Sequence, residues 1–206
     1  MARYTEAVCK LCRRCQEKLM LKGDRCLTPK CAVEKRARPQ TRGRRRRVSD
    51  RGLQLLEKQK VRYAYGVLER QFRTIFGRAE RQAGITGENL LVLLERRMDN
   101  VVYRLGFASS RAQARQLVRH GHIVLNGRKN DTPSALVKED DTIGLRESSL
   151  GNEYCKMLKE SIEARTVASW LSLDREKLVG RVLSLPTPDE LDVTLDGKSV
   201  VEYYSR

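Results

Sequence analysis

The chain has 206 residues, 42 of them Lys or Arg and 26 Asp or Glu, which gives a formal net charge of +16 at pH 7. This surplus favours a polyanionic partner. A membrane-spanning or exported protein is not expected, because the longest aliphatic run, residues 90–94, is far shorter than the roughly 20 residues that cross a bilayer and the first residues lack the apolar run of a signal peptide.

The positive charge is concentrated in the first quarter of the chain. Residues 1–47 contain 16 basic and 4 acidic residues, whereas residues 48–206 contain 26 and 22. A concentrated surplus is typical of a binding arm or contact surface, whereas a uniform one can serve solubility alone. We therefore predict that residues 1–47 form a separate basic arm. The arm lacks the Trp, Phe and Leu face of a helix that lies on a membrane.

The basic arm also holds five of the six cysteines. Cys9 and Cys12, then Cys26 and Cys31, form two pairs separated by 13 residues, a spacing typical of a tetrahedral structural zinc site. So short and charged a segment cannot stabilise itself by burial, and four thiolates on one Zn²⁺ would supply the folding energy. Cys15 lies in an equally good pair with Cys12, so the spacing leaves the first pair open. A redox pair and unliganded thiols are further alternatives, and a disulfide framework is disfavoured because cytosolic thiols stay reduced.

An arginine-rich linker, residues 36–51, follows the cysteines. Its four consecutive arginines repel one another in free solution and would become ordered along a phosphate backbone, with release of counterions. The predicted phosphate contacts of the linker are Arg42, Arg44, Arg45, Arg46 and Arg47.

The pattern from Ser49 to about residue 83 is helical, with Ser49 or Asp50 as the predicted N-cap. The apolar spacing indicates helix packing, so Tyr63 and Phe72 are expected in a core more than on a base-stacking surface. The cations of this segment that we predict to contact the phosphates of a polyanionic partner are Lys58, Lys60, Arg62, Arg70 and Arg73.

Residues 90–127 carry the most informative pattern. Apolar residues stay in phase from Leu90 to Leu105, which predicts one continuous helix that ends at Gly106. Ser110 and Gln113 form a capping-box signal for a second helix, which Gly121 closes.

The second of these helices carries a stripe of positive charge. Arg111, Arg115 and Arg119 recur at every fourth position, beside a capped helix N-terminus that suits phosphate oxygens. A short strand at 123–125 follows, and its Asn126-Gly127 step is the strongest short-range hairpin signal. Charge reversal at Arg111 or Arg115 is therefore expected to weaken binding to a polyanion without unfolding the protein.

The remaining segments complete an α+β fold. Further strands are predicted at Val137 and 142–145, a helix at 152–164, and a tail from Trp170 whose bulky last residues should fold back onto earlier helices. The predicted domains are a zinc-binding basic arm (1–47), a helical domain (48–89, completed by about 176–206) and, with the helix that follows it, an inserted module of two helices on a small antiparallel sheet (90–175).

The residues that carry a family resemblance run through the whole chain. They read RYTEAVCKLCRR at the start, LKGDRCLTPKCAVEKR, LEKQKVRYAYGVLERQFRTIF, LERRMDNVVYRLGFASSRAQARQLVRHGHIVLNG, WLSLD at 170–174 and VEYYSR at the end. The central stretch resembles the RNA-binding module named after ribosomal protein four of the small subunit, and the whole chain is similar to the bacterial family of that protein. Cys15 and residues 175–198 depart from the family pattern.

The resemblance implies a site and a function. It implies one structural Zn²⁺ on Cys9, Cys12, Cys26 and Cys31, and a primary binder of small-subunit rRNA that nucleates subunit assembly in the cytoplasm. It also implies contact with ribosomal protein five, an influence on decoding accuracy and, in some members, repression of their own operon. The module residues expected to face RNA are Arg104, Ser110, Arg111, Arg115, Arg119, His120 and His122.

Two other classes of protein could carry the same module. An RNA-modifying enzyme would need a further catalytic domain, yet no Gly-rich loop follows a strand and both histidines lie within the module, so no enzyme activity and no small-molecule substrate are expected. A zinc-containing translational regulator would differ in its partner, because it would bind mRNA or DNA outside the small subunit.

Overall fold

The computed structural model describes residues 4–35, 49–190 and 195–205, and the chain divides into two units. The first, here called the helical unit, comprises Met1–Leu90 and Asp192–Arg206; the second, the sheet unit, is Leu91–Leu191. The linker arginines predicted to contact phosphate, Arg42 and Arg44 to Arg47, lie outside the described residues.

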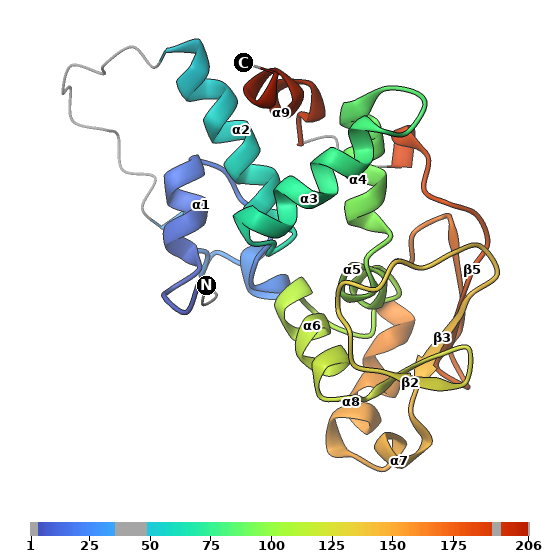
Figure 1. Cartoon of the computed structure of the whole chain (residues 1–206). Helices are drawn as coiled ribbons and strands as arrows, with labels where there is room; N and C mark the ends of the chain where they lie inside the picture. Colours follow the sequence, from blue (N-terminus) through green and yellow to red (C-terminus); the bar gives the residue numbers. More distant parts are fainter. Residues whose placement is uncertain (1–3, 36–48, 191–194, 206) are drawn as a thin grey trace. The chain divides into compact units, whose positions relative to one another are not determined.

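The helical unit is built from short helices drawn from both ends of the chain (Figure 1). Among the described residues they are α1 (Cys9–Cys15), η1 (Gly23–Cys26), α2 (Asp50–Ala64), α3 (Glu69–Glu80), the start of α4 (Thr86–Glu95) and α9 (Gly197–Tyr204). Ser49 is the N-cap of α2, as predicted, and its hydroxyl accepts a hydrogen bond from the Gly52 amide at 3.2 Å.

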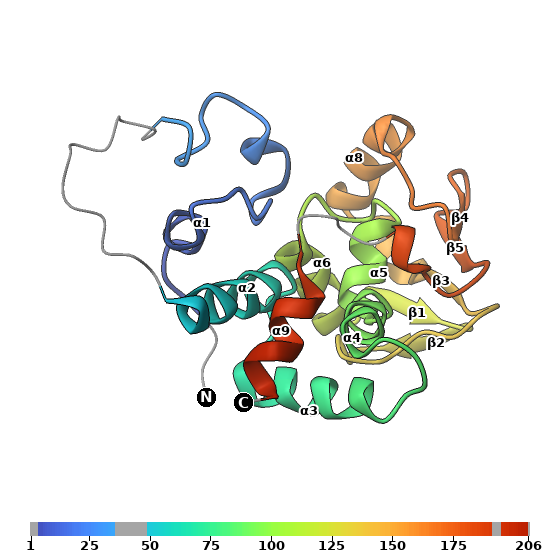
Figure 2. The ribbon, with the colours of Figure 1, turned by 90° about the horizontal axis from the view of Figure 1, so that it is seen from above.

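The C-terminal helix α9 folds back onto α2 and α3, as its apolar residues predict (Figure 2). The ring of Tyr204 lies 4.6 Å from that of Phe76, centroid to centroid. The backbones of Gly87 and Gly197 approach so closely that a Cβ on either would lie under 3.0 Å from the other. Glycine is therefore required where the last helix passes the start of α4.

A polar cluster joins these three helices at Glu69. Its carboxylate accepts hydrogen bonds from Lys58 Nζ at 2.8 Å, Arg62 Nη1 at 2.9 Å and the Tyr204 hydroxyl at 2.9 Å. Burial alone would raise the pKa of Glu69, but the hydrogen bonds from Lys58 and Tyr204 outweigh it and lower the pKa. The folded helical unit is therefore stabilised by ionised Glu69.

Replacing Glu69 with glutamine should destabilise the helical unit by about 2 kcal/mol at pH 7, because buried Lys58 loses its counter-ion. A depressed carboxyl pKa stabilises the fold fully above the unfolded value of about 4.3 and loses that contribution as the pH falls through the folded value. Urea unfolding followed by circular dichroism should therefore show a difference between wild type and variant that shrinks from pH 7 to pH 3.5. A difference that is constant across this range would contradict this role of Glu69.

The sheet unit packs helices against one face of a five-stranded antiparallel sheet with strand order β2-β1-β3-β5-β4. Its described elements are the end of α4, α5 (Met98–Arg104), α6 (Arg111–Arg119), β1 (Ile123–Leu125), β2 (Arg128–Asn130), β3 (Thr142–Leu145), α7 (Glu147–Leu150), α8 (Glu153–Ser161), η2 (Ile162–Ala164), β4 (Leu171–Asp174), β5 (Val179–Val182) and η3 (Pro188–Glu190). A single core cluster, which includes Val101, Leu105, Ile143 and Trp170, lies between helices and sheet.

The local turn and cap signals of the sheet unit are confirmed. The Ser110 hydroxyl accepts from the Gln113 amide at 3.3 Å at the start of α6, while Gln113 Oε1 accepts from the Ser109 amide at 2.9 Å. Asn126 and Gly127 both have positive φ, 50° and 75°, as the tight turn between β1 and β2 requires.

Two predicted boundaries are corrected. The helix predicted from Leu90 to Leu105 is broken at Arg97, whose backbone is extended and forms a β-bridge with Leu136. The Met98 amide donates a hydrogen bond to the Ala135 carbonyl at 2.8 Å. It therefore does not make the backbone bond that would continue the helix through Arg97. The end of the inserted module, predicted at residue 175, lies at Leu191. Strands β4 and β5 pair with each other and β5 pairs with β3, so both strands belong to the sheet of this unit.

Candidate nucleic-acid interface

Helix α6 presents the predicted arginine stripe and buries its opposite face. Ala114 and Val118 are fully buried in the core of the sheet unit, which fixes the rotation of the helix. Arg111, Arg115 and Arg119 follow one another at successive turns on the other side. We define the arginine surface as these three residues together with Arg104 of α5.

Three of the four guanidinium groups of the arginine surface donate hydrogen bonds to buried acceptors. Arg104 donates from Nε and Nη2 to the two carboxylate oxygens of Glu95, at 2.9 and 2.7 Å. Arg115 Nη1 donates to Asp99 Oδ2 at 2.6 Å. Arg111 Nε donates to the Asn100 side-chain oxygen at 2.7 Å. The side chains of Arg104, Arg111 and Arg115 nevertheless remain 26%, 13% and 20% exposed, so part of each is accessible to a ligand.

A fully buried ion pair supports this arrangement. The side chain of Arg97, 1% exposed, donates to Asp99 from Nε at 3.1 Å and from Nη2 at 2.8 Å. Asp99 thus bonds one buried arginine and one arginine of the surface. Four guanidinium groups (Arg97, Arg104, Arg111 and Arg115) share two carboxylates, so the network keeps a positive excess, and three of its arginines are partly exposed.

Sequence reasoning missed the buried acceptors Glu95, Asp99 and Asn100. Their signal lies in the segment LERRMDN, where acidic residues interrupt both a basic stretch and an apolar stripe. An acid that shares a helix face with core residues must be paired when it is buried, and the nearest cations are these arginines.

The polar residues that flank the arginine surface occupy different environments. His120 is exposed just after α6, whereas His122 is half-buried and its Nδ1 lies 2.9 Å from Ser149 Oγ. Ser110 is buried as the N-cap of α6. Arg119 and His120 are therefore placed to touch a ligand directly, while Ser110 and His122 hold local structure.

In the helical unit the predicted RNA contacts divide into two groups. Lys58 is corrected: it is 4% exposed and its ammonium bonds Glu69, so it is a structural residue. Lys60 and Arg62 are also engaged, Lys60 with Glu17 and Glu57 at 2.7 Å each and Arg62 with Glu69. Arg70 and Arg73 are exposed on α3 and can meet a ligand.

The cysteines of the arm lie near one another around Cys12. Burial raises the pKa of the Cys12 thiol, and the neighbouring thiols of Cys26, Cys9 and Cys31 raise it further. Backbone amides face two of the sulfurs: Leu19 N–H bonds that of Cys12, and Lys22 N lies 3.4 Å from Cys26 Sγ. Within the described part of the chain, no group of three or more His, Cys, Asp or Glu residues already has the arrangement of a metal site.

Cys15 shares a small buried cluster with Cys12 and Leu19, and Leu56 and Tyr63 of α2 pack against this cluster. Burial raises the pKa of the Cys15 thiol, and the nearby Lys60 ammonium of α2 lowers it. The geometry thus groups Cys15 with the contact between α1 and α2.

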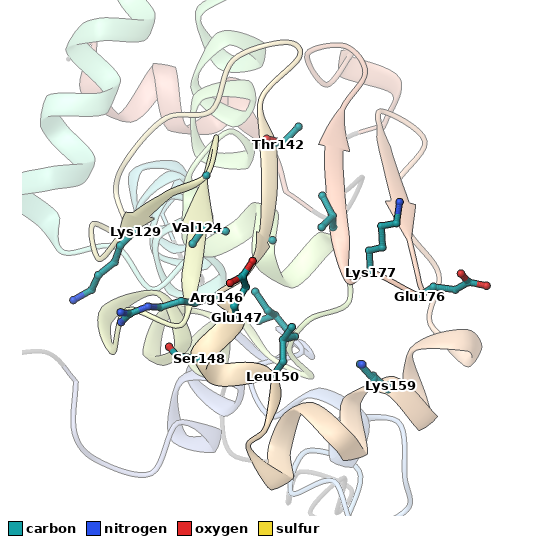
Figure 3. Close-up of a pocket in the computed structure, with 14 residues that line it drawn as sticks. Val124, Lys129, Thr142, Arg146, Glu147, Ser148, Leu150, Lys159, Glu176 and Lys177 are labelled. Carbon is teal, nitrogen blue, oxygen red and sulfur yellow. The ribbon is translucent and has the colours of Figure 1, made fainter.

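An open groove crosses the uncovered face of the sheet (Figure 3). Its floor is Val124, Gly144 and Val179, and its volume is about 820 Å³. Charged side chains of both signs rim it: Lys129, Arg146, Glu147, Lys159, Glu176 and Lys177. In Figure 3, Lys129 and Arg146 point to one side, away from Lys177, so these groups do not converge on a common point as an enzyme site requires.

Comparison with known proteins gives matches along the whole chain. Residues 3–95 match the family described as Ribosomal protein S4/S9 N-terminal domain, and residues 96–143 match the S4 domain. The chain is 56% identical to the small ribosomal subunit protein uS4 of Dehalococcoides mccartyi and 53% identical to that of Syntrophomonas wolfei. It is 55% identical to uS4A of Alkaliphilus oremlandii. Each of these alignments covers 100% of both chains. Among the described residues, no helix has the length and apolar character needed to cross a membrane.

Proposed function

Because the chain belongs to the ribosomal protein S4 family, we propose that it is a structural, rRNA-binding protein of the small ribosomal subunit and not an enzyme. The arginine surface is the observation that carries this function: partly exposed arginine side chains, held by buried acids, lie on α5 and on α6 with its capped start. Such a surface binds phosphates, while the shape of the folded RNA supplies selectivity. The protein then acts in the cytoplasm, where small subunits are assembled.

Co-sedimentation tests this proposal most simply. The protein, expressed at its natural level, should sediment with small subunits at one copy per subunit in a sucrose gradient. A large free pool bound to mRNA or DNA would favour a zinc-containing regulator of translation and would contradict the structural role.

We also propose two finer roles that rest on the family resemblance. The protein binds rRNA early and nucleates assembly of the subunit body, and it meets ribosomal protein five at a site that influences decoding accuracy. Reconstitution of subunits without this protein should then block the addition of later proteins of the body. Normal assembly without it would contradict the first role, and unchanged misreading after disruption of the contact with ribosomal protein five would contradict the second.

We further propose that Cys9, Cys12, Cys26 and Cys31 hold one structural Zn²⁺. The donor set fits, because four thiols lie near one another in a segment with little apolar core, and amides face the sulfurs of Cys12 and Cys26. Bound zinc would hold the thiols as thiolates and link the two cysteine pairs.

Metal analysis of protein purified without chelators should give about one zinc per chain. Cys31→Ser should abolish this zinc, whereas Cys15→Ser should keep it, because the Cys15 thiol lies near Lys60 and Glu57 of α2, while that of Cys12 lies near Cys9, Cys26 and Cys31. Much less than one zinc per chain in the wild type would contradict the site. Loss of zinc in Cys15→Ser would show that Cys15 is one of the zinc ligands.

A further inference from the structure

Glu95 and Asp99 are buried acids that bond arginines of the surface proposed to bind a polyanion. If attraction to phosphate were the whole task of this surface, these acids would oppose it, since each cancels one positive charge. We propose, on the basis of the proposed rRNA-binding function, that Glu95 and Asp99 are positioning residues for RNA recognition. They fix the directions of Arg104, Arg111 and Arg115, so that the arginine surface selects one folded RNA over others.

Each acid is anchored in one element and holds arginines of others. Glu95, the last residue of α4, bonds Arg104 of α5 and lies 3.8 Å from Arg111 Nη2 of α6. Asp99, in the first turn of α5, bonds Arg97 before it and Arg115 of α6. The position of each guanidinium therefore depends on the junction of three helices and not on one flexible side chain.

Arg111 is held from two sides. The Asn100 side-chain amide donates to Glu95 Oε2 at 2.6 Å and to the Glu95 carbonyl at 2.9 Å, which turns its oxygen toward Arg111 Nε. The guanidinium of Arg111 also lies over the Tyr103 ring, 4.8 Å from its centroid. Glu95 thus acts on Arg111 through Asn100, and the contact with Tyr103 restricts the guanidinium from a second side.

A fixed arginine differs from a mobile one in specificity. A long, mobile side chain loses rotamer freedom when it binds, whereas a side chain that is already held loses less. The five N–H donors of a guanidinium lie on more than one edge, so a group can bond a carboxylate inside and a phosphate outside. A guanidinium that is held in place favours phosphates at one position. A guanidinium that has lost its carboxylate partner moves freely, keeps its full charge and attracts any RNA.

The test compares two RNAs for each variant: a small-subunit rRNA fragment that the wild type binds, and an unrelated folded RNA of equal length. For Glu95→Gln, and for Asn100→Ala, which changes no charge, we expect the preference for the rRNA to fall about three- to tenfold. The affinity of Glu95→Gln for the unrelated RNA should stay equal or rise. Glu139→Gln removes an equal charge at an exposed position of the same unit and should keep the wild-type preference.

Three outcomes would overturn the inference. Equal losses on both RNAs would mean that Glu95 only stabilises the fold, and circular dichroism would show this as unfolding at the assay temperature. Equal gains on both would mean that it only lowers the net charge. An unchanged preference in Asn100→Ala, if that variant is folded, would remove the proposed link to Arg111.

A wild type with no preference for the rRNA would contradict the proposed function itself. Failure of the inference and failure of the proposed function are therefore distinguishable.

Discussion

Replacing Arg119 or Arg115 with glutamate should lower the affinity for small-subunit rRNA about ten- to a hundredfold, because a charge-assisted bond to phosphate is worth about 1.5–3 kcal/mol. The new carboxylate would also repel the phosphates around it. Equilibrium binding at fixed, moderate salt measures the effect, since affinity for RNA falls steeply as salt rises.

The two arginines need different controls. Arg115 bonds buried Asp99, so Arg115→Glu would set two carboxylates together and also destabilise the fold, which the stripe pattern alone does not predict. Arg119 is exposed at the end of α6 and tests RNA contact more cleanly. Arg175→Glu, an equal charge change at an exposed residue after β4, is the matched control. Equal losses in Arg119→Glu and Arg175→Glu would contradict the interface.

Removal of the proposed zinc should have the largest effect on the arm. Structural zinc contributes an apparent free energy on the order of 10 kcal/mol in small zinc modules at pH 7, far more than the small cluster around Cys12, Cys15 and Leu19 can replace. A chelator, or Cys26→Ser, should therefore unfold residues 9–31 while the sheet unit stays folded.

Amide hydrogen exchange gives a local measurement of this unfolding. The amides of Leu19 and Lys22, which face cysteine sulfurs, should lose protection on chelation, while those of the sheet unit keep theirs. Readdition of zinc should restore protection in the wild type and in Cys15→Ser. Unchanged exchange after chelation would show that the arm folds without metal.

Features that depend on near neighbours could be predicted from the sequence. Ser110 and Gln113 cap α6, and Asn126-Gly127 turns between β1 and β2, because a few adjacent residues decide each of these structures. The phase of Arg111, Arg115 and Arg119 on α6 follows from helical periodicity in the same way. The α+β class and the site on α6 follow from such local signals.

Features that depend on distant partners could not be predicted. The break at Arg97 arises because residues 133–137 take its neighbours' backbone bonds, although the apolar phase continues on both sides. Lys58 resembles a surface cation in the sequence, but Glu69 and Tyr204 pair with it and cover it. Strands β4 and β5 are short, and only their pairing with each other and with β3 assigns them to the sheet.

Cross-linking of the bound protein to small-subunit rRNA tests the central claim most directly, because it locates the contact on the folded chain. Mass spectrometry of the cross-linked peptides should place contacts of the sheet unit within residues 104–122, around the arginine surface and His120. Cross-links of the sheet unit confined to Lys159 and Lys177, on the side of the groove away from Lys129 and Arg146, would show that another surface binds RNA and would contradict this claim.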